Sequence, residues 1–231
     1  MMEFEELLHP TFIAMSPTVV LERHQRILEK YGMDNLIKRN EFKRAREMYE
    51  TARYAIGMTA RTKIFYWVTP GKKNETPDTY IIWMENQSKK LFAECVEVVQ
   101  WERHVNDMFE IIRKKISKAY PSNFVILIHV EREGDHIDSQ YFADLHHRLQ
   151  NCKISSGAVR LWFSITNKGD KDTLVAELYP TDSYTEFQTS YILNSYPLSQ
   201  QIIKIDVISQ PSRIIFKEED FDIVLPVLPK L

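Results

Sequence analysis

Two acidic residues, Asp78 and Glu94, have positions that suggest a chemical role. Glu94 lies within residues 91–99, an otherwise mostly apolar stretch that predicts a strand. A carboxylate buried there without a partner would be costly in free energy or would take up a proton. Asp78 follows Pro77 at the start of the preceding predicted strand, so we expect a short hairpin to bring the two carboxylates together on one face. Such a pair suits Mg²⁺ or Mn²⁺, and two bridged ions can activate water against a phosphodiester.

The same two carboxylates also have a purely structural explanation. Ion pairs with Lys89, Lys90 or Arg113 would satisfy them without a metal. The acidic and histidine side chains between residues 135 and 147 have no recognised metal-ligand spacing, and a solvated surface explains them. The aromatic residues 65–67 are expected in the core of a strand rather than as a platform for RNA bases.

Charge divides the chain into a basic front and an acidic back. Residues 38–63 contain eight basic and three acidic side chains, and residues 170–231 contain ten acidic and five basic ones, although the formal net charge is −2. A basic helix attracts phosphate groups, but most charged runs are simply solvated helix faces. The candidates for RNA contact on this helix are Lys43, Arg44, Arg46 and Arg53.

Composition excludes several classes of protein. The chain has 231 residues, of which 44% are hydrophobic and 27% charged, as expected of a globular domain with a sizeable core. No apolar run approaches the ~20 residues that a membrane-spanning helix needs, and the acidic start does not resemble a secretory signal. Two cysteines indicate a reducing, intracellular compartment. Only six glycines occur and no phosphate-binding glycine motif is found, which argues against a nucleotide-dependent enzyme.

Hydrophobic periodicity predicts an α/β fold, with a twisted mixed sheet flanked by helices. A first helix should begin at Ser16 and Pro17 and end at Gly32, and a second should run from residue 34 or 35 to residue 56, with Gly57 as its stop. The remaining predicted elements are strands at 61–68, 79–84, 91–99 and 124–130, helices at 105–119 and 140–151, and a hairpin of strands 159–166 and 173–179. We expect a domain at residues 1–195 and a C-terminal extension or linker at residues 196–231.

Two motifs within this order of elements resemble a nuclease superfamily. Pro77-Asp78, followed by Glu94-Cys95-Val96 in an αβββαβ arrangement, resembles the PD-(D/E)XK nucleases. Residues 3–10, 29–32, 40–42 and 76–115 resemble the polymerase acidic subunit of orthomyxoviruses, in a thogotovirus-like form. The resemblance covers roughly residues 1–190.

The resemblance implies a place in a viral RNA-dependent RNA polymerase. In influenza-like relatives this N-terminal domain is the cap-snatching endonuclease, which cuts capped host RNA into primers for viral transcription. The implied partners are the other subunits of the heterotrimeric polymerase and RNA, without a membrane, and the implied location is the host cell nucleus. Mn²⁺ or Mg²⁺ would be the cofactor of an active site, and no cofactor is expected of an inactive one.

Only part of the family's site is matched residue by residue. Asp78 and Glu94 match the family's two strand carboxylates, whereas the position of its metal-binding histidine falls on Met48. The segment between Gly57 and Pro77 is too short for the insertion that carries a further glutamate; its only acid is Glu75, although Glu50 could reach in from the preceding helix. The position of the catalytic lysine falls on Phe109 or Ile112, and Val96 replaces the lysine of the simpler motif.

These losses predict a degenerate metal site. Losing a metal ligand and a lysine that stabilises the transition state each lowers the rate by orders of magnitude, so we expect a domain without nuclease activity that acts in polymerase assembly or RNA guidance. One alternative is an active Mn-dependent endonuclease that adds Glu50 or Glu47 to the two matched carboxylates, with Lys114 or Lys115 as the basic residue. A second alternative is a non-catalytic α/β interaction module unrelated to a polymerase.

Overall fold

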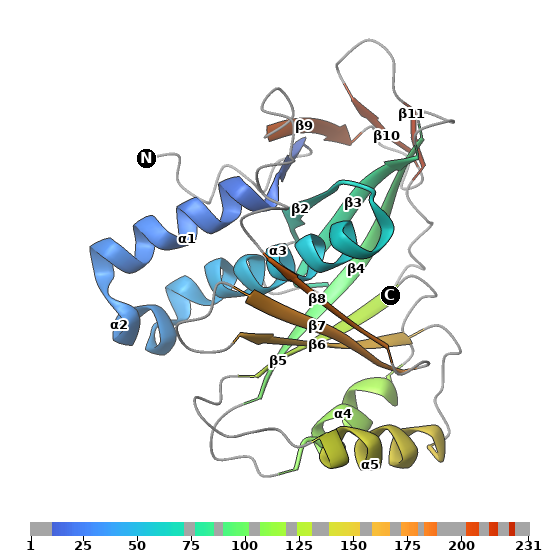
Figure 1. The fold of residues 1–231 in the computed structure, drawn as a ribbon. Helices are drawn as coiled ribbons and strands as arrows, with labels where there is room; N and C mark the ends of the chain where they lie inside the picture. The colour runs from blue at the N-terminus through green and yellow to red at the C-terminus, as the bar shows by residue number, and fades with distance from the viewer. Residues whose placement is uncertain are drawn as a thin grey trace.

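The protein has a mixed α/β fold in which helices flank a mixed sheet, as the sequence predicts (Figure 1). A computed structural model describes these residues: 11–71, 77–85, 90–101, 107–118, 124–130, 139–152, 159–166, 172–179, 183–188, 202–207, 213–216 and 222–224. In this part of the chain no helix has the length and apolar character required to cross a membrane.

Helix α1 (Pro17–Tyr31) begins and ends where its capping residues predict. The Ser16 side chain accepts a hydrogen bond from the Val19 amide at 3.4 Å, and Pro17 occupies the first turn. Gly32 ends the helix with φ of 78°, a conformation that favours glycine, and its amide donates to the Leu28 carbonyl at 2.8 Å.

The second predicted helix is divided, and Gly57 does not stop it. Helix α2 (Met33–Lys38) and a short 3₁₀ turn (Asn40–Phe42) precede the long helix α3 (Lys43–Thr62), in which Gly57 is buried. A glycine inside a helix costs only about 1 kcal/mol, which packing of the buried residues around it outweighs. Helix α3 ends at Lys63, which has φ of 61°, and the strand predicted from residue 61 therefore begins later, as β2 (Tyr66–Pro70).

The described strands form one sheet in the order β11-β10-β9-β1-β2-β3-β4-β5-β6-β7-β8. Strand β4 (Lys90–Trp101) pairs antiparallel with β3 (Thr79–Glu85) along its first half and parallel with β5 (Phe124–Val130) along its second half. Strands β5 and β6 are also parallel, and β11 returns to pair with the start of β4. The remaining strands are β1 (Thr11–Met15), β6 (Val159–Thr166), β7 (Asp172–Tyr179), β8 (Ser183–Gln188), β9 (Ile202–Val207), β10 (Arg213–Phe216) and β11 (Asp222–Val224).

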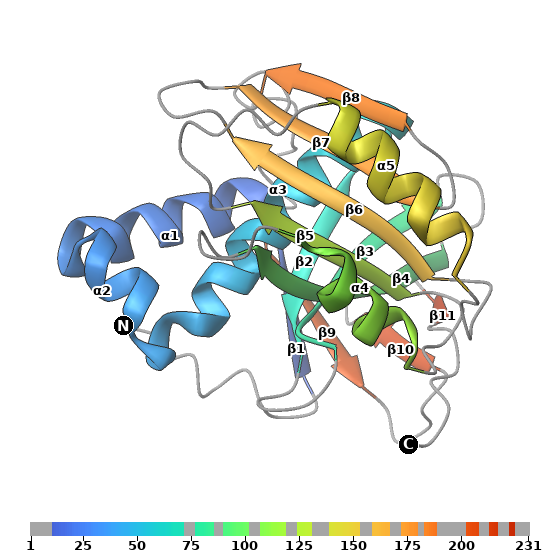
Figure 2. The ribbon, with the colours of Figure 1, turned by 90° about the horizontal axis from the view of Figure 1, so that it is seen from below.

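Two apolar cores lie on opposite faces of the central strands (Figure 2). On one face α3 packs against a cluster that includes Val68, Ile81, Val96 and Leu127. On the other face α4 (Phe109–Ile116) and α5 (Ser139–Gln150) cover a second cluster, which includes Cys95, Val99, Ile126 and Ile128. Strand β5 contributes to both clusters, so it is buried on both faces.

The C-terminal residues contribute strands to the same sheet. Strand β9 pairs with β1 along the whole length of β1, and β10 pairs with β9. None of the strands β1, β8, β9, β10 and β11 was predicted as a strand from the sequence. The domain boundary near residue 195 stays a prediction, because pairing within a sheet does not decide whether the first 195 residues fold alone.

Candidate functional site

Asp78 lies where β4 extends beyond its partner strand. The last residue pair between β3 and β4 joins Thr79 to Val96, so β4 continues past the start of β3. There the Asp78 Oδ2 atom accepts a hydrogen bond from the Val98 amide at 2.9 Å. Gly71 faces this turn and donates its amide to the Asp78 carbonyl at 2.8 Å. The backbone around Asp78 is therefore closely fixed.

Glu97 of β4 and Lys115 of α4 form a second part of this site. Glu97 is 5% exposed, and its Oε1 atom pairs with Lys115 Nζ. Both side chains also act electrostatically on the Asp78 carboxyl group. Lys115, one of the two lysines of the alternative active set, thus reaches back from α4 to the end of the sheet.

Helix α3 supplies Glu47 and Lys43 to the same place. Glu47 lies beside the Asp78 carboxyl group, which acts on it electrostatically, and its Oε1 atom lies 3.1 Å from Lys43 Nζ. Thr51, one turn further along α3, places its hydroxyl 2.7 Å from that of Thr79, which fixes the helix over the start of β3. We name Lys43, Glu47, Asp78, Glu97 and Lys115 the carboxylate cluster.

The charges of the carboxylate cluster nearly cancel without a metal. Burial raises the pKa of Glu47, and the neighbouring Asp78 raises it further, although Lys43 opposes this. Burial also raises the pKa of Asp78, against the effects of the Val98 amide and Lys43. Three carboxyl groups facing two lysines leave one negative charge, and the raised pKa values of Glu47 and Asp78 favour the uptake of a proton at this place.

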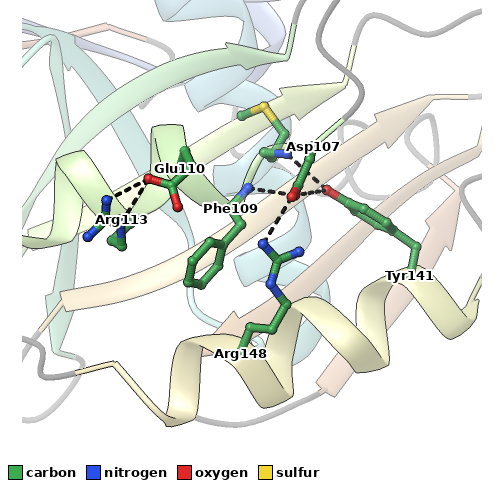
Figure 3. A network of polar contacts seen from close by, with 7 residues as sticks. Asp107, Phe109, Glu110, Arg113, Tyr141 and Arg148 are labelled. Atoms are coloured by element: carbon green, nitrogen blue, oxygen red, sulfur yellow. Dashed lines mark hydrogen bonds and ion pairs between the residues drawn. The ribbon is translucent and has the colours of Figure 1, made fainter.

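Helix α4, which carries Lys115, is anchored to α5 by a polar network (Figure 3). Asp107 accepts hydrogen bonds from the Phe109 amide and from Arg148, both at 3.0 Å. Tyr141 of α5 accepts from the Met108 amide at 3.0 Å, and the Arg148 guanidinium lies 4.0 Å from the Phe109 ring centroid. Partial burial raises the pKa of Asp107, but these hydrogen bonds lower it by more, so its pKa lies below the ordinary value.

The sequence predicted that Glu94 and Asp78 lie together on one face, but the structure separates them. Glu94 pairs across the sheet with Ile81, and it is buried on the face that α3 covers. It also lies four residues before Val98, a distance of roughly 13 Å along a strand. Because side chains alternate, Glu94 and Glu97 point to opposite faces of β4, and Glu97 takes the position expected of Glu94.

Glu50 belongs to a separate buried network. Its Oε2 atom lies 3.1 Å from Arg53 and 2.9 Å from His129 Nδ1 on β5. Burial raises the pKa of Glu50, but Arg53 and His129 lower it by more, to about 2. Glu50 is therefore an ionised partner in a packed network between α3 and β5 rather than a ligand beside Asp78.

The four residues predicted to contact RNA do not share one exposed face. Arg53 is 4% exposed and pairs with Glu50, so it is not presented to a ligand in solution. Arg46 donates to the carbonyl groups of Leu36 and Arg39, and Arg44 is half-buried. Lys43 is exposed but pairs with Glu47 of the carboxylate cluster. Of the four, Lys43 is the best placed to meet an anion.

The positions that the resemblance assigns to further site residues of the family do not lie in the carboxylate cluster. Within the described residues no group of three or more His, Cys, Asp or Glu side chains is arranged to hold a metal ion. The position of the family's histidine, Met48, is buried in the apolar core, and so is Ile112. Both cysteines are free thiols, with Cys95 in the core under α4 and α5.

Sequence reasoning missed Glu97, although part of the signal was present. Glu47 and Lys115 belong to the alternative set of active residues, and the structure brings both to Asp78. The alternation of β4 separates Glu94 from Glu97, but it does not say which face Asp78 joins. That depends on the pairing register, which the sequence did not reveal.

Comparisons of the chain with family models, with curated proteins and with solved structures found no match. The resemblance to the polymerase acidic subunit thus stays a prediction, and the function has to be argued from the site.

Proposed function

We propose that the chain is the N-terminal domain of the acidic subunit of an orthomyxovirus polymerase, thogotovirus-like, with a PD-(D/E)XK nuclease-like core that does not cut RNA. Its role is architectural: it contributes to polymerase assembly or guides RNA. The order α3, β2, β3, β4, α4, β5 supports the nuclease-like core, because it is the αβββαβ order of that superfamily.

The observation that carries the loss of cleavage is the pairing of the carboxylate cluster with its own lysines. A hard cation binds ionised oxygen ligands, and two-metal cleavage of a phosphodiester needs several of them free on one site. Here Glu97 pairs with Lys115 and Glu47 pairs with Lys43, while Asp78 lies beside Glu47. A cation would have to displace both lysines, which supply the positive charge that a metal would bring.

Thermal unfolding with and without millimolar Mn²⁺ tests this proposal. A ligand at one hundred times its Kd stabilises a protein by ~2.7 kcal/mol, which raises the melting temperature of a domain of this size by several degrees. We expect no rise, and single-stranded RNA incubated with the protein and Mn²⁺ should stay intact. A rise that disappears in Asp78→Ala and Glu97→Ala but persists in Asp144→Asn, an exposed carboxylate elsewhere, would overturn the inactive-site proposal.

A second measurement tests the assembly role separately. The purified chain should form a stable complex with the core polymerase subunit of a thogotovirus-like virus in size-exclusion chromatography. If it binds no metal and no polymerase subunit, an α/β interaction module unrelated to a polymerase explains the chain better.

The active endonuclease remains the alternative because of one specific observation. The structure gathers Glu47, Asp78, Glu97 and Lys115 at one end of the sheet, and carboxylates beside a lysine are the residue types that metal-dependent nucleases use. For this alternative the lysine pairs must open on metal binding. Mn²⁺-dependent cleavage of RNA that is lost in both Glu97→Gln and Lys115→Met would support it.

A further inference from the structure

The corner between α1 and α2 carries an exposed apolar patch. Among the residues whose side chains the structure describes, the exposed large apolar side chains are Tyr31, Met33 and Ile37, which are 36%, 53% and 43% exposed. Isolated exposed apolar residues are ordinary, but these three fall within seven consecutive positions. Met33 and Ile37 are one turn apart, so they lie on the same face of α2. We name these three residues the corner patch.

The corner patch is held in a fixed shape by contacts behind it. Asn35 donates its side-chain amide to the Tyr31 carbonyl at 2.7 Å, and the Tyr31 and Phe42 ring centroids are 4.9 Å apart. Leu36 is only 1% exposed, and Arg46 of α3 donates to its carbonyl group. A surface held in this way loses little conformational freedom when a partner binds.

The position of the corner patch makes it accessible to a large partner. Figures 1 and 2 both show α2 and the end of α1 projecting to one side of the molecule, away from the sheet. Helix α2 is also well separated from α4 and α5 in both views. A protein segment can therefore cover the corner patch without contacting α4, the helix that carries Lys115 of the carboxylate cluster.

Positive charge surrounds the corner patch. Residues 26–46 contain seven basic and three acidic side chains, a net charge of +4, whereas the whole chain has a net charge of −2. The Lys30 ammonium lies 5.0 Å from the ring centroid of Tyr31, and Lys38 and Arg39 directly follow Ile37. An acidic partner would be attracted to this corner before contact.

The existing ion pairs at the corner can be exchanged for those of a partner. Lys38 lies 3.8 Å from Asp34, and Arg39 lies 3.1 Å from Glu41, but all four side chains are more than half exposed. Exposed pairs of this kind contribute little to stability in water. Both basic groups can therefore turn to carboxylates of another protein at little cost.

We propose that the corner patch is a docking site for a segment of a partner protein that presents apolar side chains flanked by Asp or Glu. The apolar side chains of the segment bury Met33 and Ile37, and its carboxylates meet Lys38 and Arg39. RNA would satisfy the charges but leave the apolar side chains in water, and a basic segment would be repelled. The inference goes beyond the proposed function and does not depend on it.

Selection of random peptides displayed on phage, with the purified full chain as bait, tests the proposal. We expect enrichment of peptides that combine Leu, Ile or Phe with Asp and Glu. An enriched peptide should bind roughly tenfold or more weakly to the double variant Met33→Ser/Ile37→Ser, measured by fluorescence anisotropy. Circular dichroism should show that this variant melts as the wild type does, because both side chains are exposed.

A charge-reversal pair provides the matched control. Lys38→Glu/Arg39→Glu should weaken binding of the peptide and abolish the salt dependence of that binding. Lys114→Glu/Lys118→Glu, on α4 and just after its end, should do neither. The proposal is wrong if no peptide is enriched, if basic peptides are enriched, or if the enriched peptides bind the Met33→Ser/Ile37→Ser variant equally well. Dimers of the wild type that Ile37→Ser dissociates in sedimentation would identify a second copy as the occupant instead, and would also overturn it.

Discussion

Single side chains decide the charge of the carboxylate cluster. Glu97 and Glu47 are each paired with a lysine from a helix, and Asp78 lies between them. Glu50, only one turn from Glu47 on α3, has its pKa lowered because Arg53 and His129 face it, whereas burial raises the pKa of Glu47. Neighbouring positions of one helix thus hold carboxyl groups whose pKa values are shifted in opposite directions.

Replacement of Lys115 by Met should destabilise the fold, because Glu97 loses the lysine with which it is paired. The change leaves a buried carboxylate without its lysine, which we expect to cost about 2 kcal/mol, a value reduced because Lys115 is partly exposed. Urea unfolding at neutral pH measures this free energy. The neighbouring exposed lysine offers the control, since Lys114→Met should change the unfolding free energy by less than about 0.5 kcal/mol. Equal effects of the two variants would contradict the pairing.

Replacement of Glu47 by Gln should change how stability depends on pH. The pKa of Glu47 is raised in the folded protein, so between the ordinary carboxyl pKa of about 4 and the raised value the folded state holds a proton that the unfolded state has lost. The wild type therefore loses stability as the pH rises through this window. Glu47→Gln should remove part of that loss, so the unfolding free energy of the variant relative to the wild type increases from pH 4 to pH 8. A constant difference would show that Glu47 titrates normally.

At the scale of the elements, local signals were sufficient for some boundaries and not for others. Ser16 and Gly32 mark the ends of α1 through their own backbone and side-chain hydrogen bonds, so they could be read from the sequence. Gly57 looked like a helix stop, but its burial under the sheet keeps it helical, and burial depends on residues far away in the chain.

The site shows the same limit of prediction. Asp78, and Glu47 and Lys115 as an alternative, were found because their residue types and helix positions are visible in the sequence. Glu97 was missed because the choice between it and Glu94 depends on how far β4 extends beyond β3. That extension is a property of pairing between strands, which no local pattern encodes.

The turn that holds Asp78 should be sensitive to a single methyl group. A Cβ atom at Gly71 would lie 1.9 Å from the Pro77 carbonyl oxygen, so Gly71→Ala must displace the backbone before Asp78. We expect a loss of about 3 kcal/mol in the unfolding free energy. Gly32→Ala is a suitable comparison, because nothing lies within 4 Å of its Cβ position and only the positive φ is strained, at a cost of about 1 kcal/mol. A smaller effect at Gly71 than at Gly32 would contradict this close approach.

At the scale of the whole molecule, the sheet joins the two ends of the chain. Strand β1, near the N-terminus, is paired along its full length with β9, and β11 returns to β4 in the centre of the fold. Figure 1 shows β9, β10 and β11 at the end of the molecule away from α4 and α5.

Truncation after residue 200 should therefore loosen β1 selectively. Removal of β9 leaves the outer edge of β1 unpaired, so hydrogen exchange of the β1 amides that bond to β9 should become faster. The amides of β5, which is buried on both faces and pairs with β4 and β6, should exchange as slowly as before. Unchanged hydrogen exchange in β1 would show that residues 1–195 form a domain to which β9 contributes little. Faster hydrogen exchange in all strands would show that the domain needs its C-terminal strands.

The pairing of β1 with β9 has a consequence during synthesis on the ribosome. Strand β1 precedes β9 by nearly two hundred residues, so β9 is translated roughly 10–40 s later at ordinary rates of elongation. Throughout that interval the nascent chain carries an open strand edge that can pair with other nascent chains on the same messenger RNA. This edge stays open to such pairing until β9 has left the ribosome and covers it.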